Sequence, residues 1–183
     1  IVRNNVDGDF AECGCKHGHS SMILAEVMKA EQGQARKLWI FDSFEGGLSD
    51  KNEEDRTTAL GNTNERKTQK QKQRFSSSYD HVLNVFKPYG FVEAVKGWIP
   101  DSLDCDARDR KFAFAHIDVD LYEPTKASIE FFYNRMDKGG IIVVDDYGSA
   151  TFPGCQKAVD EFLEGHPHSF FLVSHTLGCV VVK

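Results

Sequence analysis

The chain has 183 residues, of which 40% are hydrophobic and 27% are charged, and this composition excludes a disordered or fibrous protein. A chain of this length predicts a single domain over residues 1–183 with a buried core. The formal net charge of −6 argues against nucleic acid as the main partner, because phosphate binding depends on Lys and Arg. No apolar run approaches the roughly 18–20 residues that span a bilayer, so we expect no membrane partner.

The cysteines indicate the redox environment. The chain has five of them, an odd number, with no C-x-x-C pair and no spacing that suggests a disulfide framework. Reduced thiols of this kind are typical of cytoplasmic proteins, and we expect that location.

The first third of the chain predicts a strand, a glycine-containing turn and a helix. A short strand over 9–13 runs into a turn between Gly14 and Gly18. Ser20 and Ser21 then offer N-cap chemistry for a helix with apolar residues at helical spacing. A second strand over 37–41 leads to Asp42.

Residues Ser49–Ser78 differ in character from the rest of the chain. Asn, Thr, Gln, Lys and Glu dominate, and the large or aliphatic apolar residues are few: Ala59, Leu60 and Phe75. The second half is rich in cations, namely Arg66, Lys67, Lys70, Lys72 and Arg74. A stretch with so little apolar surface to bury predicts a mobile excursion, either a solvated loop or a lid that gates a substrate.

After the excursion the alternation of strands and helices resumes. We expect a helix over 79–89, strands over 91–95 and 112–117, and a helix that has Pro124 in its first turn and includes Met136. Gly139 and Gly140 are predicted to stop that helix before a β-branched strand over 141–144. A helix over 156–164 follows, and strands over 169–173 and 179–183 are joined too closely for a crossover, so they must pair antiparallel.

This order predicts an α/β fold with a Rossmann-like, doubly wound and mostly parallel sheet, to which the C-terminal hairpin adds one reversed strand. Ligands of such sheets bind where the strands end, and here those positions are strongly acidic. They are Glu12, Gly14, Asp42, Gly97, Trp98, Asp118, Asp120, Asp145 and Asp146.

Three of these residues indicate a cofactor class. Asp42 follows the second strand, where a carboxylate accepts hydrogen bonds from ribose hydroxyls. Trp98 offers a flat apolar surface for an adenine ring. Glu12 suits a cationic tail and is a poor host for a pyrophosphate. The pattern therefore favours a nucleoside with a sulfonium group over a dinucleotide.

The motifs around these positions resemble the class I S-adenosylmethionine-dependent methyltransferases, and more narrowly the macrocin O-methyltransferase family. The resemblance covers nearly the whole chain outside the excursion. The matching stretches are Gly8–Gly14 with Gly18–Ser21, Leu38–Gly46, Gly97–Leu103, His116–Thr125, Gly139–Gly148 and Pro153–Asp160.

The resemblance implies a class I methyltransferase fold and a set of site residues. The S-adenosylmethionine site would be lined by Glu12, Gly14, Ser20, Ser21, Asp42, Ser43, Gly97, Trp98 and Asp118. Asp118, Asp145 and Asp146 match the family's ligands for a divalent metal, and Asp118 is also its general base. All-oxygen ligation of this kind selects Mg²⁺ or another hard cation over zinc. At position 19 this chain has His, where the family usually has a second glycine.

The leading hypothesis is an enzyme that transfers a methyl group from S-adenosylmethionine to a hydroxyl of a sugar or glycosylated small molecule, assisted by Mg²⁺. A further copy of the chain, in a homo-oligomer, is among the expected partners. A metal-dependent hydrolase would also use the aspartates, but it leaves Asp42 and Trp98 without a role. A cofactor-binding module without catalysis is the third hypothesis.

Overall fold

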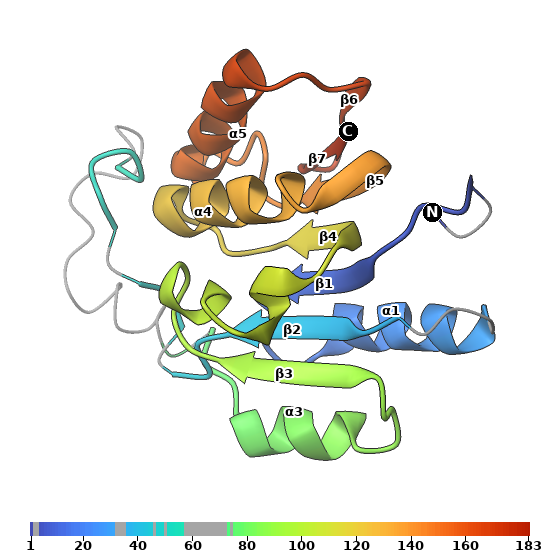
Figure 1. Ribbon diagram of the computed structural model, residues 1–183. Helices are drawn as coiled ribbons and strands as arrows, with labels where there is room; N and C mark the ends of the chain where they lie inside the picture. The colour runs from blue at the N-terminus through green and yellow to red at the C-terminus, as the bar shows by residue number, and fades with distance from the viewer. Residues whose placement is uncertain (2–3, 32–35, 46, 50, 57–72, 74) are drawn as a thin grey trace.

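The computed structural model describes residues 1, 4–31, 36–45, 47–49, 51–56, 73 and 75–183. Its centre is a seven-stranded sheet with the strand order β3-β2-β1-β4-β5-β7-β6 (Figure 1). The strands are β1 (Asp9–Cys13), β2 (Leu38–Asp42), β3 (Val92–Lys96), β4 (Phe112–Ile117), β5 (Met136–Val144), β6 (Phe170–Val173) and β7 (Cys179–Val182). The helices are α1 (His19–Ala30), α3 (Tyr79–Phe86), α4 (Tyr122–Tyr133) and α5 (Pro153–Gly165), with 3-10 turns at Asp101–Leu103 and Asp106–Asp109.

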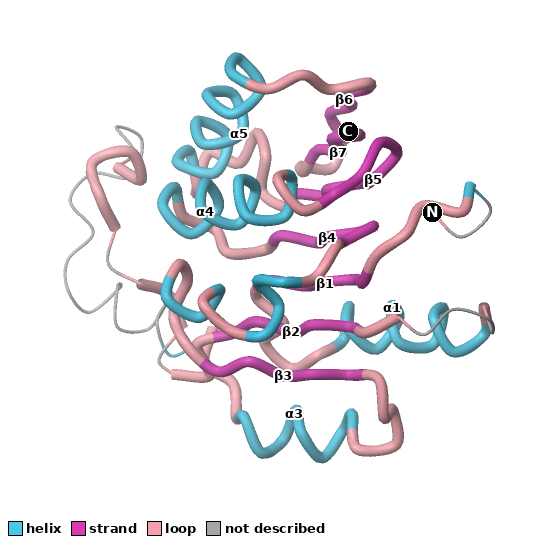
Figure 2. The backbone as a smooth tube through the Cα atoms, viewed as in Figure 1, coloured by secondary structure: helices cyan, strands magenta, loops and turns pink. Residues whose placement is uncertain are grey.

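The sheet is doubly wound and mostly parallel. Strands β1 to β5 pair parallel with one another, whereas β7 runs antiparallel to both β5 and β6. The expected fold, with one reversed strand from the C-terminal hairpin, is therefore confirmed. Figure 2 shows loops at the left-hand end of the sheet, the end toward which the arrows of β1 to β4 point in Figure 1.

Side chains of the central strands alternate between two apolar layers, as the pleat requires. Phe10, Leu38 and Ile40 pack in a cluster with Ala25 of α1 and with residues of α3. Residues of opposite parity, such as Ala11, Trp39 and Phe41, pack in a second cluster with α4 and α5. In the part of the chain that the structure describes, the sheet is thus held between two pairs of helices.

Two local predictions were wrong. Helix α1 has Gly18 as its N-cap, with no side-chain cap, so Ser20 and Ser21 lie inside the helix. Helix α4 ends at Tyr133, and Met136 is the first residue of β5. Gly139 and Gly140, which were predicted to stop this helix, lie within β5 instead. Gly139 donates its N–H to the Lys183 carbonyl at 2.8 Å. The pairing of β5 with β4 has a register shift in this region. Glycine in a strand is common at such irregularities.

The described part of the predicted excursion is partly docked. The cationic residues Arg66, Lys67, Lys70, Lys72 and Arg74 lie outside the described residues, and so does most of the stretch that we expected to be mobile. Residues 51–56 are described, and Asp55 among them is only 3% exposed. This buried carboxylate ties the start of the segment to the body of the protein.

Two further findings concern membranes and thiols. In the part of the chain that the structure describes, every helix falls short of the length and apolar character needed to cross a membrane.

All five cysteines are free thiols, and Cys13, Cys15, Cys155 and Cys179 are buried. Burial raises the pKa of each of these four thiols.

Asp9 carries the first testable prediction, on stability. Its carboxylate is 2% exposed and accepts hydrogen bonds from Arg110 Nε at 2.7 Å, Trp39 Nε1 at 2.9 Å and the Lys37 N–H at 2.9 Å. Burial alone raises the pKa of Asp9, but these donors outweigh it and hold the pKa below its usual value. Asp9→Ala is expected to lower the free energy of unfolding by about 2–3 kcal/mol near pH 7, because charge-assisted bonds are lost.

The pH dependence of this loss follows from the lowered pKa. The stabilisation is present above the unfolded-state pKa of aspartate and is lost as the pH falls through the lower folded-state value. Denaturant unfolding at about pH 7 and about pH 3 should therefore show the difference between the two proteins shrinking in acid. Asp104→Ala, which removes only an exposed ion pair with Arg108, is the control and should cost less than about 0.5 kcal/mol. Equal losses at both pH values would contradict the assignment.

Candidate functional site

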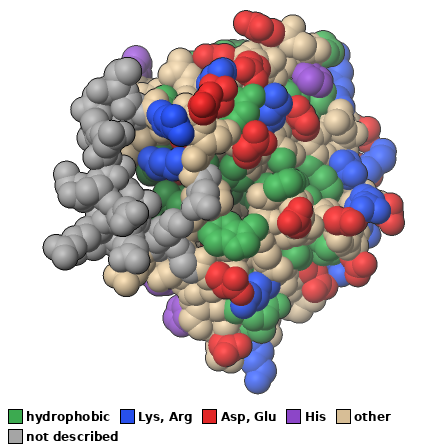
Figure 3. All heavy atoms as spheres, turned by 90° about the vertical axis from the view of Figure 1, so that its left-hand side faces the viewer, with side chains coloured by type: hydrophobic (Ala, Val, Ile, Leu, Met, Phe, Trp, Pro, Cys, Tyr) green, Lys and Arg blue, Asp and Glu red, His purple; other side chains and the backbone are tan. Residues whose placement is uncertain are grey.

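A pocket opens where β1, β2, β3 and β4 end. Each strand end contributes to its lining, together with the segment after β2 and the first turn of α4. The lining residues are Gly14, Lys16, Phe41, Asp42, Ser43, Gly47, Leu48, Ser49, Phe75, Gly97, Trp98, Ile99, Asp118, Val119, Asp120 and Pro124. Figure 3 looks at the molecule from the side toward which these strands point, where apolar, basic and acidic side chains lie beside the undescribed residues in grey.

Asp42 is held rigidly at one side of this pocket. Its Oδ2 accepts the Lys16 N–H and its Oδ1 accepts the Phe44 N–H, both at 2.8 Å. Both donor residues have positive φ, 50° at Lys16 and 53° at Phe44, in a conformation that non-glycine residues seldom adopt. Since each carboxylate oxygen offers a further lone pair, Asp42 can still accept hydrogen bonds from a ligand.

Gly14 brings the end of β1 very close to the end of β4. A Cβ at Gly14 would lie 1.8 Å from the Asp118 carbonyl oxygen, and the φ of Gly14 is +84°. A glycine is therefore required here by the chain's own packing. The sequence interpretation attributed this glycine to a close approach of the ligand, and the structure adds this internal reason.

Glu12 is not among the residues that line the pocket. It is fully buried, accepts a hydrogen bond from the Ser21 hydroxyl and pairs through Oε1 with His116 Nδ1 at 2.8 Å. Burial lowers the pKa of His116, but the hydrogen bond to Glu12 prevails and raises it. Ser20 is also absent from the lining. The structure thus places six of the nine expected cofactor residues around the pocket and leaves Glu12, Ser20 and Ser21 outside it.

Three carboxylates gather at the ends of β4 and β5. Oxygen atoms of Asp118, Asp120 and Asp146 all lie within 4.8 Å of one another. Asp120 and Asp146 have φ of 60° and 58°, so the backbone turns out of the extended path at both residues. Side chains from two neighbouring strands can then converge, and the oxygen donors are those that hard divalent cations prefer.

Electrostatics in this cluster favour a bound cation or proton. Burial, followed by the charge of Asp145, raises the pKa of Asp118 to about 7. Burial and the neighbouring carboxylates also raise the pKa of Asp120, and burial raises that of Asp146. Crowded carboxylates of this kind bind protons more tightly when no cation compensates their charge.

The cluster differs by one member from the predicted metal ligands. The sequence predicted Asp118, Asp145 and Asp146, whereas the structure gathers Asp120 in place of Asp145. Asp145 continues the ladder by donating its N–H to the Ile117 carbonyl at 2.8 Å, and its side chain is exposed. Both residues follow the end of β5 at Val144, and the φ of 58° at Asp146 turns the backbone there, so the strand pleat does not fix the direction of either side chain.

Several lining residues were missed in the sequence. Lys16 and Leu48 lie outside the stretches that resemble the family, whereas Ile99 and Val119 lie within them but have apolar side chains that signal no binding role. Phe75 could have been found, because it is a large apolar residue within an otherwise polar stretch. Such a residue has surface to bury, and here it lines the pocket.

Comparisons with known proteins agree with this architecture. The chain is 30% identical over 170 residues to demethyldecarbamoylnovobiocin O-methyltransferase of Streptomyces niveus, an alignment that covers 88% of this chain and 60% of that protein. It is 28% identical over 172 residues to mycinamicin III 3''-O-methyltransferase of Micromonospora griseorubida, covering 90% of this chain and 64% of the relative. The chain therefore spans less than two thirds of the length of these curated relatives.

Solved structures and a family model extend the comparison. The O-methyltransferase NovP superposes with a TM-score of 0.79 at 26% identity, covering 100% of this chain and 74% of NovP. The calicheamicin methyltransferase CalS11 shares the fold, with a TM-score of 0.73 at 23% identity, covering 99% of this chain and 74% of CalS11. The model of the family described as macrocin-O-methyltransferase (TylF) matches residues 1–169, and the chain therefore belongs to the macrocin O-methyltransferase family.

Proposed function

We propose that this chain transfers a methyl group from S-adenosylmethionine to a hydroxyl of a sugar or glycosylated small molecule, with the help of a divalent metal. The observation that carries the proposal is the position of Asp118 and Asp120. Both line the pocket, and both belong to the carboxylate cluster. One cavity therefore joins a nucleoside-type site near Asp42 to a site for a hard cation.

Several lining residues suit the cofactor by their chemistry. Asp42 would accept hydrogen bonds from the ribose hydroxyls, and Gly97 and Trp98 would flank the adenine. Trp98 is 37% exposed, which leaves ring surface for stacking. Ser43, Gly14 and Asp118 complete this side of the pocket. When bound, S-adenosylmethionine supplies a methyl group that its sulfonium already activates.

On the acceptor side, the chain must hold the hydroxyl in line with the methyl group and remove its proton. Asp118 is the proposed acceptor of that proton, because it lines the pocket and belongs to the carboxylate cluster. Asp118, Asp120 and Asp146 would hold the metal. A divalent cation there supplies Lewis-acid polarisation of the acceptor oxygen.

The proposed acceptor class comes from the relatives. One of them, 30% identical over 169 residues, is a tetracenomycin rhamnosyl 4'-O-methyltransferase of Streptomyces olivaceus. Its name describes methylation of a sugar attached to a natural product. We propose an acceptor of the same chemical class for this chain.

Asp42→Ala tests the cofactor half of the site. The substitution is expected to weaken binding of S-adenosylhomocysteine by about 1–3 kcal/mol, because the charge-assisted bonds to ribose are lost. Isothermal titration calorimetry measures this directly. Glu45→Ala, which removes a nearby exposed partner of Lys96, is the control and should leave the affinity unchanged. An unchanged affinity in Asp42→Ala would remove Asp42 from the site.

The function itself is tested with radiolabelled S-adenosylmethionine, Mg²⁺ and a panel of glycosides. Methyl transfer to a sugar hydroxyl supports the proposal. Binding of S-adenosylhomocysteine without transfer to any acceptor would favour a cofactor-binding module. If the folded protein does not bind S-adenosylhomocysteine, the proposed methyl transfer is wrong.

A further inference from the structure

A buried carboxylate docks residues 51–56 onto the start of α4. Asp55 Oδ1 accepts the Tyr122 N–H at 2.8 Å, and Oδ2 accepts the Asn52 N–H at 3.2 Å. The Asn52 side chain in turn accepts the Glu54 N–H at 2.9 Å and the Asp55 N–H at 3.2 Å. This Asx turn fixes the direction of Asp55 toward the helix.

The contact supplies a cap that α4 otherwise lacks. Leu121 is the N-cap residue of α4 and makes no side-chain cap bond, so the Tyr122 N–H depends on a partner from elsewhere. That partner is Asp55, which lies 67 positions away in the chain. A carboxylate at this position also interacts favourably with the helix dipole.

The same carboxylate packs against the first turn of α5. A Cβ at Gly154 would lie 2.0 Å from Asp55 Oδ1 and 2.9 Å from the Tyr122 Cβ. Gly154 is the second residue of α5, where an alanine would ordinarily be the better helix former. The amino ends of two helices thus meet at Asp55, and Gly154 leaves the space that this close approach needs.

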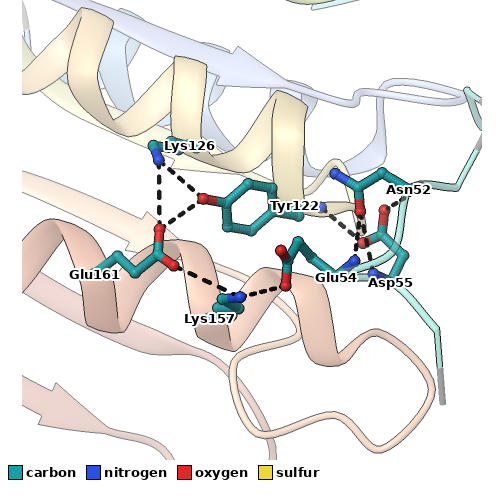
Figure 4. A network of polar contacts seen from close by, with 7 residues as sticks. All are labelled: Asn52, Glu54, Asp55, Tyr122, Lys126, Lys157 and Glu161. Atoms are coloured by element: carbon teal, nitrogen blue, oxygen red, sulfur yellow. Dashed lines mark hydrogen bonds and ion pairs between the residues drawn. The ribbon is translucent and has the colours of Figure 1, made fainter.

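An outer layer of charges surrounds the buried contact (Figure 4). Tyr122 Oη donates to Glu161 at 2.6 Å, and Lys126 Nζ donates to Tyr122 Oη at 2.8 Å. Lys157 pairs with both Glu54 and Glu161. These side chains are partly exposed, so each pair contributes little by itself, and the buried Asp55 is the central tie.

The contact between Asp55 and Tyr122 lies next to two parts of the pocket, the wall that follows β2 and the loop that follows β4. Leu48 and Ser49, shortly before the docked segment, line the pocket. Tyr122, whose N–H donates to Asp55, follows directly after the loop that carries Asp118 and Asp120. Asp55 therefore connects the pocket wall that follows β2 with the aspartate loop that follows β4.

We propose that Asp55 is a positioning residue. By capping α4 and filling the space above Gly154, it sets the distance between the wall at Leu48–Ser49 and the loop at Asp118–Asp120. Asp55 does not touch the ligand. This inference rests on the proposed function only for its effect on the cofactor, because the effect on the wall and the loop is independent of any ligand.

The first measurement is hydrogen exchange followed by mass spectrometry on the protein without ligand. Asp55→Ala is expected to speed exchange by about tenfold in peptides covering Leu48–Ser49 and Asp118–Tyr122, because the wall and the loop open locally. Peptides from β6 and β7 serve as an internal reference and should not change. Gly154→Ala should reproduce the pattern, since its methyl group displaces the same carboxylate. Gly165→Ala, at the other end of α5 with nothing within 4 Å, is the matched control and should behave as wild type.

The second measurement is calorimetry with S-adenosylhomocysteine, done well below each variant's melting temperature. Asp55→Ala and Gly154→Ala are expected to raise the dissociation constant about tenfold, since a ligand must re-order the wall. Asp55→Asn keeps an oxygen for the Tyr122 N–H and should recover most of the affinity. Gly154→Ala serves as the second variant if Asp55→Ala does not fold.

The outcomes separate the two ideas. Wild-type protein that does not bind S-adenosylhomocysteine would overturn the proposed function and leave the exchange result to decide on Asp55. Asp55→Ala that melts earlier but shows wild-type exchange at Leu48–Ser49 and Asp118–Tyr122 would overturn the positioning role. Wild-type affinity in both Asp55→Ala and Gly154→Ala would overturn it as well.

Discussion

Asp118→Asn is expected to reduce methyl transfer by about a thousandfold or more at saturating Mg²⁺, because loss of a general base alone costs about 10²–10⁴-fold. The residue lines the pocket and also belongs to the carboxylate cluster, so the substitution removes the proton acceptor and one oxygen of the cation site. Chelation with EDTA is expected to abolish activity, and Mg²⁺ should restore it. Initial rates with radiolabelled cofactor measure both effects.

The control for this prediction is Asp137→Asn. Asp137 is exposed, pairs with Lys111 and lies near the start of β5, so activity should match that of wild type. Full activity in a metal-free preparation would disprove the metal role, and an active Asp118→Asn enzyme would disprove the base. Comparing the Mg²⁺ affinities of Asp120→Asn and Asp145→Asn then decides which of the two completes the site.

Gly14→Ala is expected to be the most destabilising single methyl group in the site. The added Cβ would meet the Asp118 carbonyl oxygen at 1.8 Å, and the φ of +84° is itself unfavourable for alanine. The contacting carbonyl belongs to the backbone of Asp118, just after β4, and cannot rotate away as a side chain could. The collision is therefore relieved only if the ends of β1 and β4 separate. We expect a loss of more than about 3 kcal/mol in the free energy of unfolding, measured by denaturant titration.

Gly148→Ala separates the collision from the backbone strain. Gly148 has a φ of +86°, almost that of Gly14, but nothing lies within 4 Å of its Cβ position. Its substitution should cost about 1–2 kcal/mol, the price of a left-handed alanine alone. Similar losses in the two variants would show that the end of β1 can move away from Asp118 at little cost.

The strand and helix order could be predicted because this fold gives each element a clear local signal. Buried parallel strands such as 141–144 are continuous apolar runs, and the short link before β7 forces an antiparallel hairpin. The start of β5 was missed for the opposite reason. Gly139 and Gly140 signal a helix stop in isolation, and only their backbone hydrogen bonds with Lys183 make them part of a strand.

The site residues likewise divide into those that the sequence predicts and those that it does not. Asp42, Gly97 and Trp98 could be placed in the pocket because a parallel sheet brings all its strand ends to one edge. The direction of a side chain just beyond a strand depends on one or two backbone angles that composition does not reveal. Positive φ at Asp120 and Asp146 decides which carboxylates converge, and a hydrogen bond to Ser21 keeps Glu12 inside.

The four buried thiols make local opening of this protein measurable. Only a thiolate reacts with a maleimide, and burial raises the pKa of the Cys13, Cys15, Cys155 and Cys179 thiols, so each reacts at an appreciable rate only when its surroundings open. Cys13 and Cys15 flank Gly14, whereas Cys155 follows Gly154. After a timed pulse of alkylating reagent, the masses of the peptides show which cysteines have reacted. Labelling of Cys13 or Cys15 would report opening at the β1–α1 turn, and labelling of Cys155 would report opening at α5, with no substrate needed.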